Sequence, residues 1–347
     1  MEFKNKNIVI TGGCGFIGTN AAIELSSKNN VLIIDNLSRR GTEYNLQYLK
    51  KNHDIRFFKI DISDKEKISD FFRMNKKIDA ILHFAGQVAV TTSIKEPYFD
   101  FLSNLTGTIN ILESVRKYKV KPIIIFSSTN KVYGSLDKYE LLESNSKYIF
   151  KSKKMKGINE SEPVDFYSPY GCSKGSADQY IHDYFRIFDI PTIVFRQSCI
   201  YGKRQFGVED QGWLAWFLFS LMKKKIATVF GTGKQVRDVL YISDLIDAYK
   251  AALENISDTA GNIYNIGGGL KNSFSIIEYL YYVADRYNLP LKIKNKEWRP
   301  GDQLIYISDT TKFEKKTGWR VKTDYFKGID LLYEWLLDNY NIISRFI

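Results

Sequence analysis

Residues 7–18 read NIVITGGCGFIG, a short β-branched run that passes directly into a turn with glycines spaced three apart, at Gly12, Gly15 and Gly18. The stretch that follows, NAAIELSSK at 20–28, has a helical pattern. Glycine at this spacing permits a tight turn and lets the backbone approach a pyrophosphate, whose charge is met by free N–H groups at the helix N-terminus. The order of strand, glycine-rich turn and helix therefore predicts a dinucleotide-binding βαβ unit.

An acidic residue in the right place strengthens this interpretation. Asp35 ends the second expected strand, 17 positions after Gly18, where its carboxylate can accept hydrogen bonds from the adenosine ribose hydroxyls. The same carboxylate would repel a 2′-phosphate, which favours NAD over NADP. Arg39 and Arg40 are close enough to moderate this preference. A turn with an ordinary surface aspartate is the alternative, which the βαβ context disfavours.

Short β-branched runs alternate with amphipathic segments of helix length along the first part of the chain. We expect buried strands at 8–10, 31–34, 57–60, 80–83, 123–126 and 192–195. This rhythm predicts an α/β fold, a Rossmann doubly wound parallel sheet with a smaller C-terminal substrate-binding lobe. We expect the NAD-binding domain at 1–196, with a polar insertion at about 135–166 that forms a surface excursion or lid. The lobe is expected mainly at 197–347, with interleaved segments.

The composition indicates a globular protein with room for a large core. Of the 347 residues 44% are hydrophobic. The apolar run 214–222 is shorter than the roughly 20 residues of a membrane span, so we expect a buried helix there. The N-terminus enters a strand almost at once, without a signal-peptide pattern, and we expect a cytoplasmic protein. Cys14, Cys172 and Cys199 stand far apart, which suggests neither a disulfide framework nor a metal site.

The net charge of +11 and the pI near 9.2 raise nucleic-acid binding as an alternative function. The lysines, however, are scattered over expected helix faces and loops, as on an ordinary solvated surface. An anionic nucleotide substrate would benefit equally from this charge. We therefore expect neither a nucleic-acid nor a membrane partner.

Tyr170 and Lys174 lie four positions apart in SPYGCSKGSADQY, so both side chains project from one face if this segment is helical. A free tyrosine has a pKa of about 10 and is roughly 0.1% ionised at pH 7. An ammonium group one turn away would stabilise the phenolate, which makes Tyr170 a candidate general base. A pair of surface residues on a helix is the alternative.

The string FSSTNKVYG places Ser127, Ser128 and Thr129 at the carboxyl edge of the sheet, where open α/β folds bind ligands. The patterns TGxxGxxG, SSTxxVYG and YxxxK, in this order, resemble the extended short-chain dehydrogenase/reductase group of the NAD-dependent epimerase/dehydratase family. The resemblance covers nearly the entire chain. It implies that Thr129 holds the substrate hydroxyl and that Tyr170 is the general base and acid. Lys174 would bind the nicotinamide ribose and lower the pKa of Tyr170.

The resemblance also implies further contacts with NAD and with a nucleotide-linked sugar. The implied cofactor contacts are Gly12, Gly15, Phe16, Ile17, Gly18, Asp35, Asn36, Ser38, Arg39, Asp61, Ile62, Phe84, Ala85, Gly86, Gln87, Asn104, Ser127, Tyr170 and Lys174. The implied substrate contacts are Thr91, Ser93, Ser128, Gln197, Arg204, Gln211, Arg237 and Arg299. Among these, the arginines are expected at the diphosphate, because guanidinium groups suit phosphate oxygens.

Departures from the family pattern narrow the reaction. The dehydratases of the group carry an Asp–Glu pair immediately after the threonine, where this chain has Asn130 and Lys131. Loss of water is therefore disfavoured, and a redox-neutral epimerisation is expected. The usual asparagine of the RxxNVYG element is Cys199 here, which puts one sugar-nucleotide contact in doubt.

Several longer strings, among them FAGQVAVTTSI and YGKRQFGVEDQGWLAWF, are similar to the branch of the family that epimerises a CDP-linked sugar at C2. This implies a CDP-linked or other nucleotide-linked sugar, a transient 2-keto sugar and tightly retained NAD. It also implies a homo-oligomer, either a dimer or a tetramer. A UDP-hexose 4-epimerase, a net reductase and an NAD-binding protein without catalytic activity stay open as alternatives.

Overall fold

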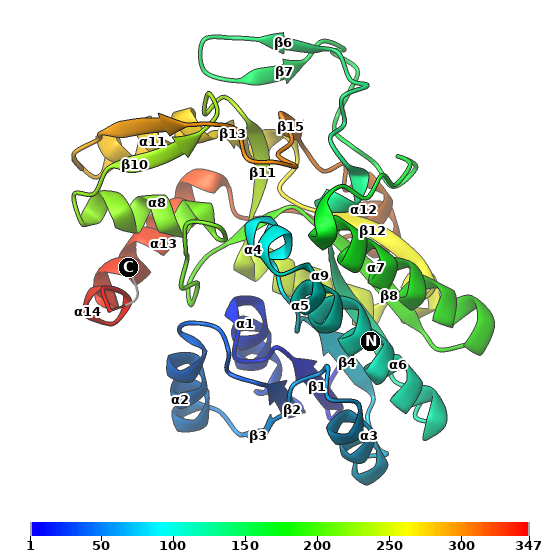
Figure 1. Cartoon of the computed structure of the whole chain (residues 1–347). Helices are drawn as coiled ribbons and strands as arrows, with labels where there is room; N and C mark the ends of the chain where they lie inside the picture. Colours follow the sequence, from blue (N-terminus) through cyan, green and yellow to red (C-terminus); the bar gives the residue numbers. More distant parts are fainter. Residues whose placement is uncertain (1, 346–347) are drawn as a thin grey trace.

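The computed structural model describes residues 2–345, and its centre is a parallel sheet of seven strands (Figure 1). The strands in spatial order are β12 (Asn262–Ile266), β8 (Thr192–Gln197), β5 (Ile123–Thr129), β4 (Ala80–His83), β1 (Asn7–Thr11), β2 (Asn30–Asp35) and β3 (Ile55–Lys59). The predicted Rossmann-type fold is confirmed, and all six expected strands are present. Strand β12 was not expected, because in the sequence only the glycines that follow it gave a signal, and these glycines indicated a turn.

The pairing register of the strands places the segments expected to bind ligands at one edge of the sheet. Thr11 at the end of β1 pairs with Ile34 of β2 and with His83 of β4, and Thr129 at the end of β5 pairs with Gln197 of β8. Because all these strands run in the same direction, the loops that follow them emerge side by side.

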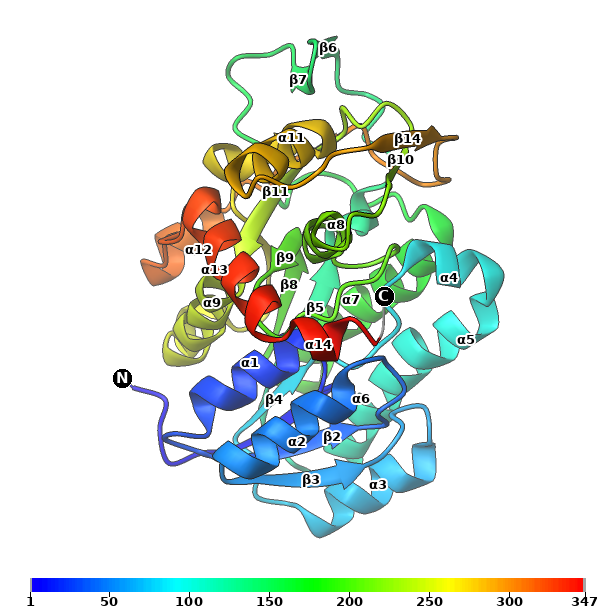
Figure 2. The ribbon, with the colours of Figure 1, turned by 90° about the vertical axis from the view of Figure 1, so that its left-hand side faces the viewer.

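Helices cover both faces of the sheet (Figures 1 and 2). On one face lie α1 (Phe16–Leu25), α2 (Thr42–Asn52) and α9 (Ile242–Glu254), and on the other lie α3 (Lys65–Met74), α6 (Gly107–Lys117) and α7 (Ser168–Phe188). Successive residues of β1 point to opposite layers. Ile8 and Ile10 pack in the core that contains α1, whereas Val9 packs in the core that contains α3. A strand buried on both faces needs a continuous run of apolar residues, which Ile8, Val9 and Ile10 provide at the centre of β1.

Four short helical segments lead to the site. The helices α4 (Val90–Lys95) and α5 (Pro97–Phe101) precede a π-helical turn, η1 (Leu102–Thr106), which continues into α6. A 3₁₀ turn, η2 (Asn130–Tyr133), follows β5 directly. Single π-helical turns inside longer helices are frequent at functional sites.

The expected C-terminal lobe contains the remaining elements, apart from those of the insertion. Its strands are β9 (Cys199–Tyr201), β10 (Ala227–Phe230), β11 (Val236–Tyr241), β13 (Ser273–Ser275), β14 (Ile293–Lys296) and β15 (Ile305–Tyr306). Its helical segments are α8 (Trp213–Met222), α10 (Ile256–Thr259), η3 (Leu270–Asn272), α11 (Ile276–Arg286), α12 (Thr311–Thr317), α13 (Tyr325–Asp338) and α14 (Tyr340–Ile343). The buried helix expected at 214–222 is α8. One continuous apolar core joins Ile8 of the sheet to Leu218 of α8 and Leu332 of α13, so the lobe is packed firmly against the sheet.

The insertion at 135–166 forms a hairpin of β6 (Leu141–Glu143) and β7 (Tyr148–Phe150), which projects at the top of Figure 1. Its tip is tied to the lobe, because Glu143 pairs with Lys234 at 2.7 Å and Lys147 pairs with Glu278 at 3.2 Å. The segment is a surface excursion anchored on the lobe. Its role as a lid stays a prediction.

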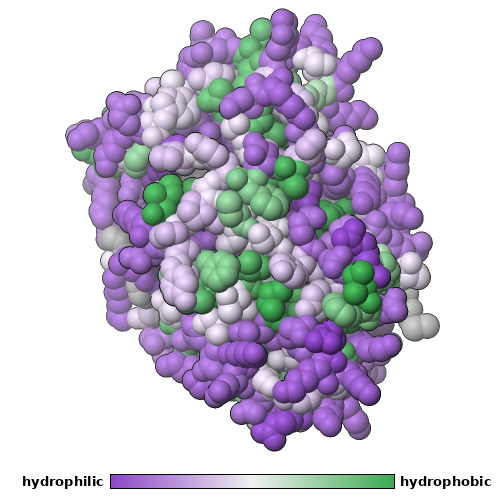
Figure 3. Space-filling view, turned by 45° about the vertical axis from the view of Figure 1, so that its right-hand side comes forward, coloured by the Kyte–Doolittle hydropathy of each residue, from purple (hydrophilic) through white to green (hydrophobic). Residues whose placement is uncertain are grey.

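Most of the surface turned forward in Figure 3 is hydrophilic, with apolar groups interrupted by polar ones. This fits the interpretation of the many lysines as a solvated surface. Across residues 2–345, every helix is too short or too polar to pass through a membrane.

Candidate active site

The glycine-rich turn between β1 and α1 has no room for side chains. Gly12 has φ +67°, and a Cβ atom added there would lie 2.7 Å from the backbone nitrogen of Ala85. A Cβ at Gly18 would lie 2.2 Å from the carbonyl oxygen of Gly12. Gly15 caps α1 without a side-chain hydrogen bond, so side chains do not occupy the first N–H groups of this helix, which include those of Phe16 and Ile17. The turn can therefore present backbone donors to a pyrophosphate.

Acidic and amide side chains gather where β2 and β3 end. The Asp35 carboxylate accepts hydrogen bonds from the backbone N–H groups of Cys14, at 2.9 Å, and Leu37, at 2.8 Å. Burial raises its pKa, and these N–H donors oppose that change. Asn36 Nδ2 donates to Asp61 Oδ2 at 2.7 Å, and Ser38 N donates to Asn36 Oδ1 at 3.0 Å. Asp35, Asn36, Ser38 and Asp61 therefore lie together at the ends of β2 and β3, where the adenosine part of NAD is expected.

The segment after β4 supplies the other wall, from Phe84 to Gln87. Asn104 is buried in η1, and its Nδ2 donates to Asp100 Oδ1 at 3.1 Å and to Ser173 Oγ at 3.0 Å. Its Oδ1 is buried without a partner and would lie 2.5 Å from a Cβ added to Gly86. A buried acceptor without a donor is costly unless a ligand satisfies it. Together with the glycine turn and Asp35, this acceptor fits bound NAD.

The expected catalytic residues converge at the carboxyl edge. Helix α7 presents Tyr170 and Lys174 on one face, and Thr129 ends β5 beside them. The Thr129 hydroxyl is a hydrogen-bond partner of Tyr170. Lys174 Nζ donates to the carbonyl oxygen of Ser127 at 2.6 Å and lies 4.0 Å from the centroid of the Phe126 ring. The segment 168–188 is helical, as the YxxxK spacing required.

Burial controls the protonation of this pair. Burial raises the pKa of Tyr170 to about 12, although the hydrogen bond with Thr129 and the charge of Arg39 both lower it. Burial lowers the pKa of Lys174 to about 7, against the charges of Asp178 and Asp100. The sequence argument expected Lys174 to lower the pKa of Tyr170. In the structure the loss of solvation is the stronger effect, because both groups are almost completely enclosed.

Sequence reasoning missed the acids that support α7. Asp178 lies one turn beyond Lys174 and forms two hydrogen bonds with the Arg196 guanidinium, at 2.9 and 3.0 Å. Ser128 Oγ donates to the same carboxylate at 2.8 Å. Asp100 of α5 is fully buried and accepts from Ser173. The spacing Tyr170, Lys174, Asp178 places three polar groups on one helix face, a signal that could have revealed Asp178.

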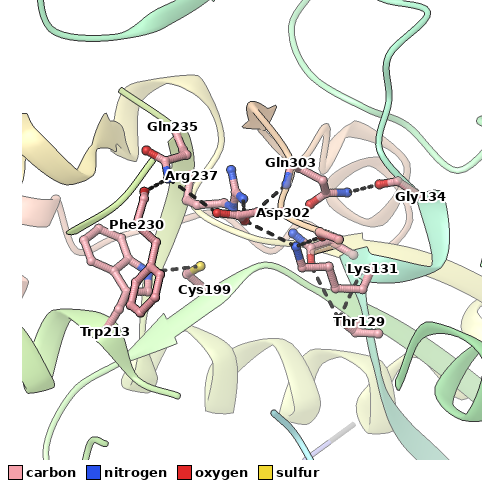
Figure 4. A network of polar contacts seen from close by, with 12 residues as sticks. Thr129, Lys131, Gly134, Cys199, Trp213, Phe230, Gln235, Arg237, Asp302 and Gln303 are labelled. Atoms are coloured by element: carbon pink, nitrogen blue, oxygen red, sulfur yellow. Dashed lines mark hydrogen bonds and ion pairs between the residues drawn. The ribbon is translucent and has the colours of Figure 1, made fainter. Parts of the chain in front are cut away.

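Two of the three arginines expected at the diphosphate form ion pairs with acids, and one of them, Arg237, lies in the network of Figure 4. Arg237 Nη2 pairs with Asp302 at 2.6 Å, and Arg299 Nη2 pairs with Asp210 at 3.1 Å. The Arg299 guanidinium also lies 3.8 Å from the centroid of the Phe230 ring. Carboxylates therefore hold both guanidinium groups.

The other expected substrate residues are dispersed. The Arg204 guanidinium stacks on Tyr48 of α2, at 3.4 Å from the ring centroid, rather than joining the lobe arginines. Gln211 Oε1 accepts from Arg39 Nη2 at 2.7 Å.

Interactions within the protein occupy several of the remaining side chains. The Ser93 hydroxyl is buried, donates to the Val90 carbonyl at 2.7 Å and accepts from the Tyr170 backbone at 3.1 Å. Gln197 Nε2 donates to the Tyr249 hydroxyl. The Thr91 hydroxyl, by contrast, is buried without a partner. Between residues 2 and 345 we find no group of His, Cys, Asp and Glu side chains arranged to hold a metal ion.

Comparison with curated proteins points to nucleotide-sugar enzymes. The chain is 43% identical over 336 residues to the CDP-paratose 2-epimerase of Salmonella typhi, covering 94% of this chain and 98% of that protein. It is 32% identical over 342 residues to a putative UDP-glucose 4-epimerase of Methanocaldococcus jannaschii, covering 96% and 99% of the two chains.

Solved structures agree with this assignment. The UDP-glucose 4-epimerase of Thermotoga maritima, solved with UDP-glucose, has a TM-score of 0.83 at 28% identity, covering 96% of this chain and 99% of that one. The UDP-glucuronic acid 4-epimerase of Bacillus cereus, solved with UDP-glucuronic acid and NAD, has a TM-score of 0.82 at 26% identity, covering 96% and 100%. The expected NAD cofactor and nucleotide-sugar epimerase class are thereby confirmed. Residues 8–267 match the NAD dependent epimerase/dehydratase family, and the chain belongs to this family.

Proposed function

We propose that this protein is a CDP-paratose 2-epimerase, which inverts C2 of CDP-paratose to give CDP-tyvelose through a transient 2-keto sugar. The observation that carries the proposal is the 43% identity to such an enzyme over 94% of the chain. The residues after Thr129 support it. Asn130 and Lys131 replace the acid pair that loss of water would require.

NAD would be held by the glycine turn through backbone N–H groups. Asp35 and Asn104 would hold it through side-chain oxygens. When bound, NAD would supply reversible hydride acceptance from C2. The protein itself must hold the sugar, move one proton and keep water out.

Tyr170 is the group that moves the proton. As a phenolate it takes the proton of the C2 hydroxyl, and as a phenol it returns that proton to the C2 oxygen, so the tyrosine ends as it began. The Thr129 hydroxyl, a partner of Tyr170, can bind the same sugar oxygen. Because burial favours the neutral phenol, positive charge is needed to stabilise the phenolate; the charge of Arg39 lowers the pKa of Tyr170, and we expect Lys174 to add to this effect.

Inversion requires the keto sugar to present its other face. The ketone carbon is planar, so the configuration of the product depends on the face that receives the hydride. The nucleotide must stay bound during this movement, and we expect Arg237 and Arg299 of the lobe to hold the diphosphate.

A UDP-hexose 4-epimerase is the second candidate, because two of the similar proteins carry a UDP-glucose 4-epimerase name. Proton NMR of the purified protein with CDP-paratose and no added cofactor separates the two, with UDP-glucose in a parallel sample. Formation of CDP-tyvelose is the expected result. Conversion of UDP-glucose alone would refute the proposed substrate and retain the mechanism.

The proposal includes a cytoplasmic location and a role in lipopolysaccharide O-antigen biosynthesis. The expected dimer or tetramer also stays a prediction. Light scattering of the purified protein would decide between these two assemblies and a monomer.

A further inference from the structure

Lys131 connects the catalytic strand to the substrate lobe. It lies in η2, two residues after Thr129, and its backbone N–H donates to Thr129 Oγ1 at 3.2 Å. Its side chain is 19% exposed and reaches the lobe, where Nζ donates to the carbonyl oxygen of Gly301 at 3.0 Å and lies 3.7 Å from Asp302 Oδ1 (Figure 4). The mechanism above gives this ammonium group no role.

Positive charge around Lys131 is not fully compensated. Asp302 faces both Lys131 and Arg237, and Asp210 is the acid that pairs with Arg299. Three cations thus share two carboxylates. The buried Nε of Arg299 has no hydrogen-bond partner. An anion with several acceptor oxygens would satisfy this donor and balance the charge, as a diphosphate does.

The chemistry of a C2 epimerase indicates where this anion must lie. C2 is bonded directly to the anomeric carbon, which carries the β-phosphate through one oxygen, whereas C4 lies across the ring. When C2 is at Thr129 and Tyr170, the β-phosphate must therefore be close to Thr129. Lys131 is the cation that lies between Thr129 and Arg237, because it touches Thr129 through its backbone and Asp302 through its ammonium group.

We propose that Lys131 binds the β-phosphate of the substrate and so holds C2 at the catalytic residues. This inference rests on the proposed function, because a sugar that reacts at C4 would carry its phosphate farther from Thr129. A related property supports it. Burial and the charge of Arg237 lower the pKa of Lys131 to about 8, and a bound phosphate would restore it.

The test compares ligands with and without a β-phosphate. Calorimetry of the NAD-loaded enzyme would measure the affinities of CDP-paratose, CDP and CMP for the wild type and for Lys131→Met, which keeps an apolar stem without the charge. We expect the variant to bind CDP-paratose and CDP about 10- to 100-fold more weakly and CMP about equally well. Lys131→Arg should recover part of this loss. Lys138→Met is the control, because the Lys138 side chain is 55% exposed on the insertion and should leave every affinity unchanged.

Equal losses for CMP and CDP, or no loss for either, would overturn the proposal. If Lys131→Met does not fold, Lys131→Gln replaces it in the same comparison. Failure of the proposed function is distinguishable, because it would appear as an inactive wild type with CDP-paratose. In that case UDP and UMP test the β-phosphate contact separately from the identity of the sugar.

Discussion

Where the pyrophosphate of NAD is expected, the surface comes from the backbone of one glycine turn, whereas at the substrate end the surface comes from side chains far apart in the sequence. Gly12 and Gly18 lie six positions apart and leave no room for a Cβ. Lys131, Arg237 and Asp302 are distant along the chain and meet only in the folded protein. The cofactor end should therefore respond to changes of backbone shape, and the substrate end to changes of charge.

The largest effect is expected where the two ends meet, at Tyr170. Tyr170→Phe removes the proton-transferring oxygen and should lower kcat by about 10²- to 10⁴-fold. The retained NAD and the melting temperature should stay close to those of the wild type, since the ring still fills its buried position. Turnover is measured by NMR with CDP-paratose. Undiminished turnover would show that another group moves the proton.

Gly12→Ala tests the cofactor end. Its φ of +67° and the contact with Ala85 predict strain and a clash, which together cost about 3 kcal/mol or roughly 10²-fold in NAD affinity. The NAD content of the purified variant is measured by absorbance after denaturation. Gly318→Ala is the matched control, with φ +73° and no atom within 4 Å of the added Cβ. It should keep its NAD, and equal NAD loss in both variants would contradict the backbone argument.

Arg237→Met tests the substrate end in the same way. Loss of a charged hydrogen-bond donor at the expected diphosphate site should raise KM for CDP-paratose by about 30-fold, near 2 kcal/mol. The NAD content should not change, because Arg237 belongs to the lobe. Loss of NAD together with an unchanged KM for CDP-paratose would contradict the assignment of Arg237 to the substrate end.

The smallest effect is a pH dependence of binding that originates at Lys131. Its pKa is about 8 in the free protein, with Arg237, Asp302 and the Cys199 thiol as its charged or titratable neighbours. A lysine binds phosphate only when protonated, so affinity for CDP-paratose should be full below this pKa and fall as pH rises above it. The decrease is at most about tenfold per pH unit, or about 1.4 kcal/mol. Calorimetry from pH 7 to 9.5 measures this decrease, and Lys131→Arg should show a flatter profile.

Local patterns allowed much of the fold to be predicted. Strands β1, β2, β4, β5 and β8 lie where their β-branched runs indicated, because strands buried on both faces need continuous apolar residues. Strand β12, with sequence NIYNI, mixes polar and apolar residues without a clear period and was not recognised beside its glycines. Its place next to β8 depends on pairing between residues 69 positions apart, Ile193 and Asn262, which no local pattern records.

The site shows the same division. The sequence could predict the glycine turn, the aspartate at the end of β2 and the YxxxK helix. Each of these features is defined by residues that lie close together along the chain. Arg204 was expected at the diphosphate and instead stacks on Tyr48, and Ser128 hydrogen-bonds Asp178. A sequence shows that a guanidinium or a hydroxyl is present but not which partner is nearest.

By itself, therefore, the sequence predicted most of the parallel sheet, and it supplied the candidate residues for NAD and for catalysis, because hydrophobic period, glycine spacing and helical repeat are short-range properties. Only the tertiary structure decided that Lys131 meets Asp302, that Asp178 pairs with Arg196 beneath the catalytic helix and that burial raises the pKa of Tyr170. These depend on which distant groups share a desolvated space, and desolvation is a property of the packed chain.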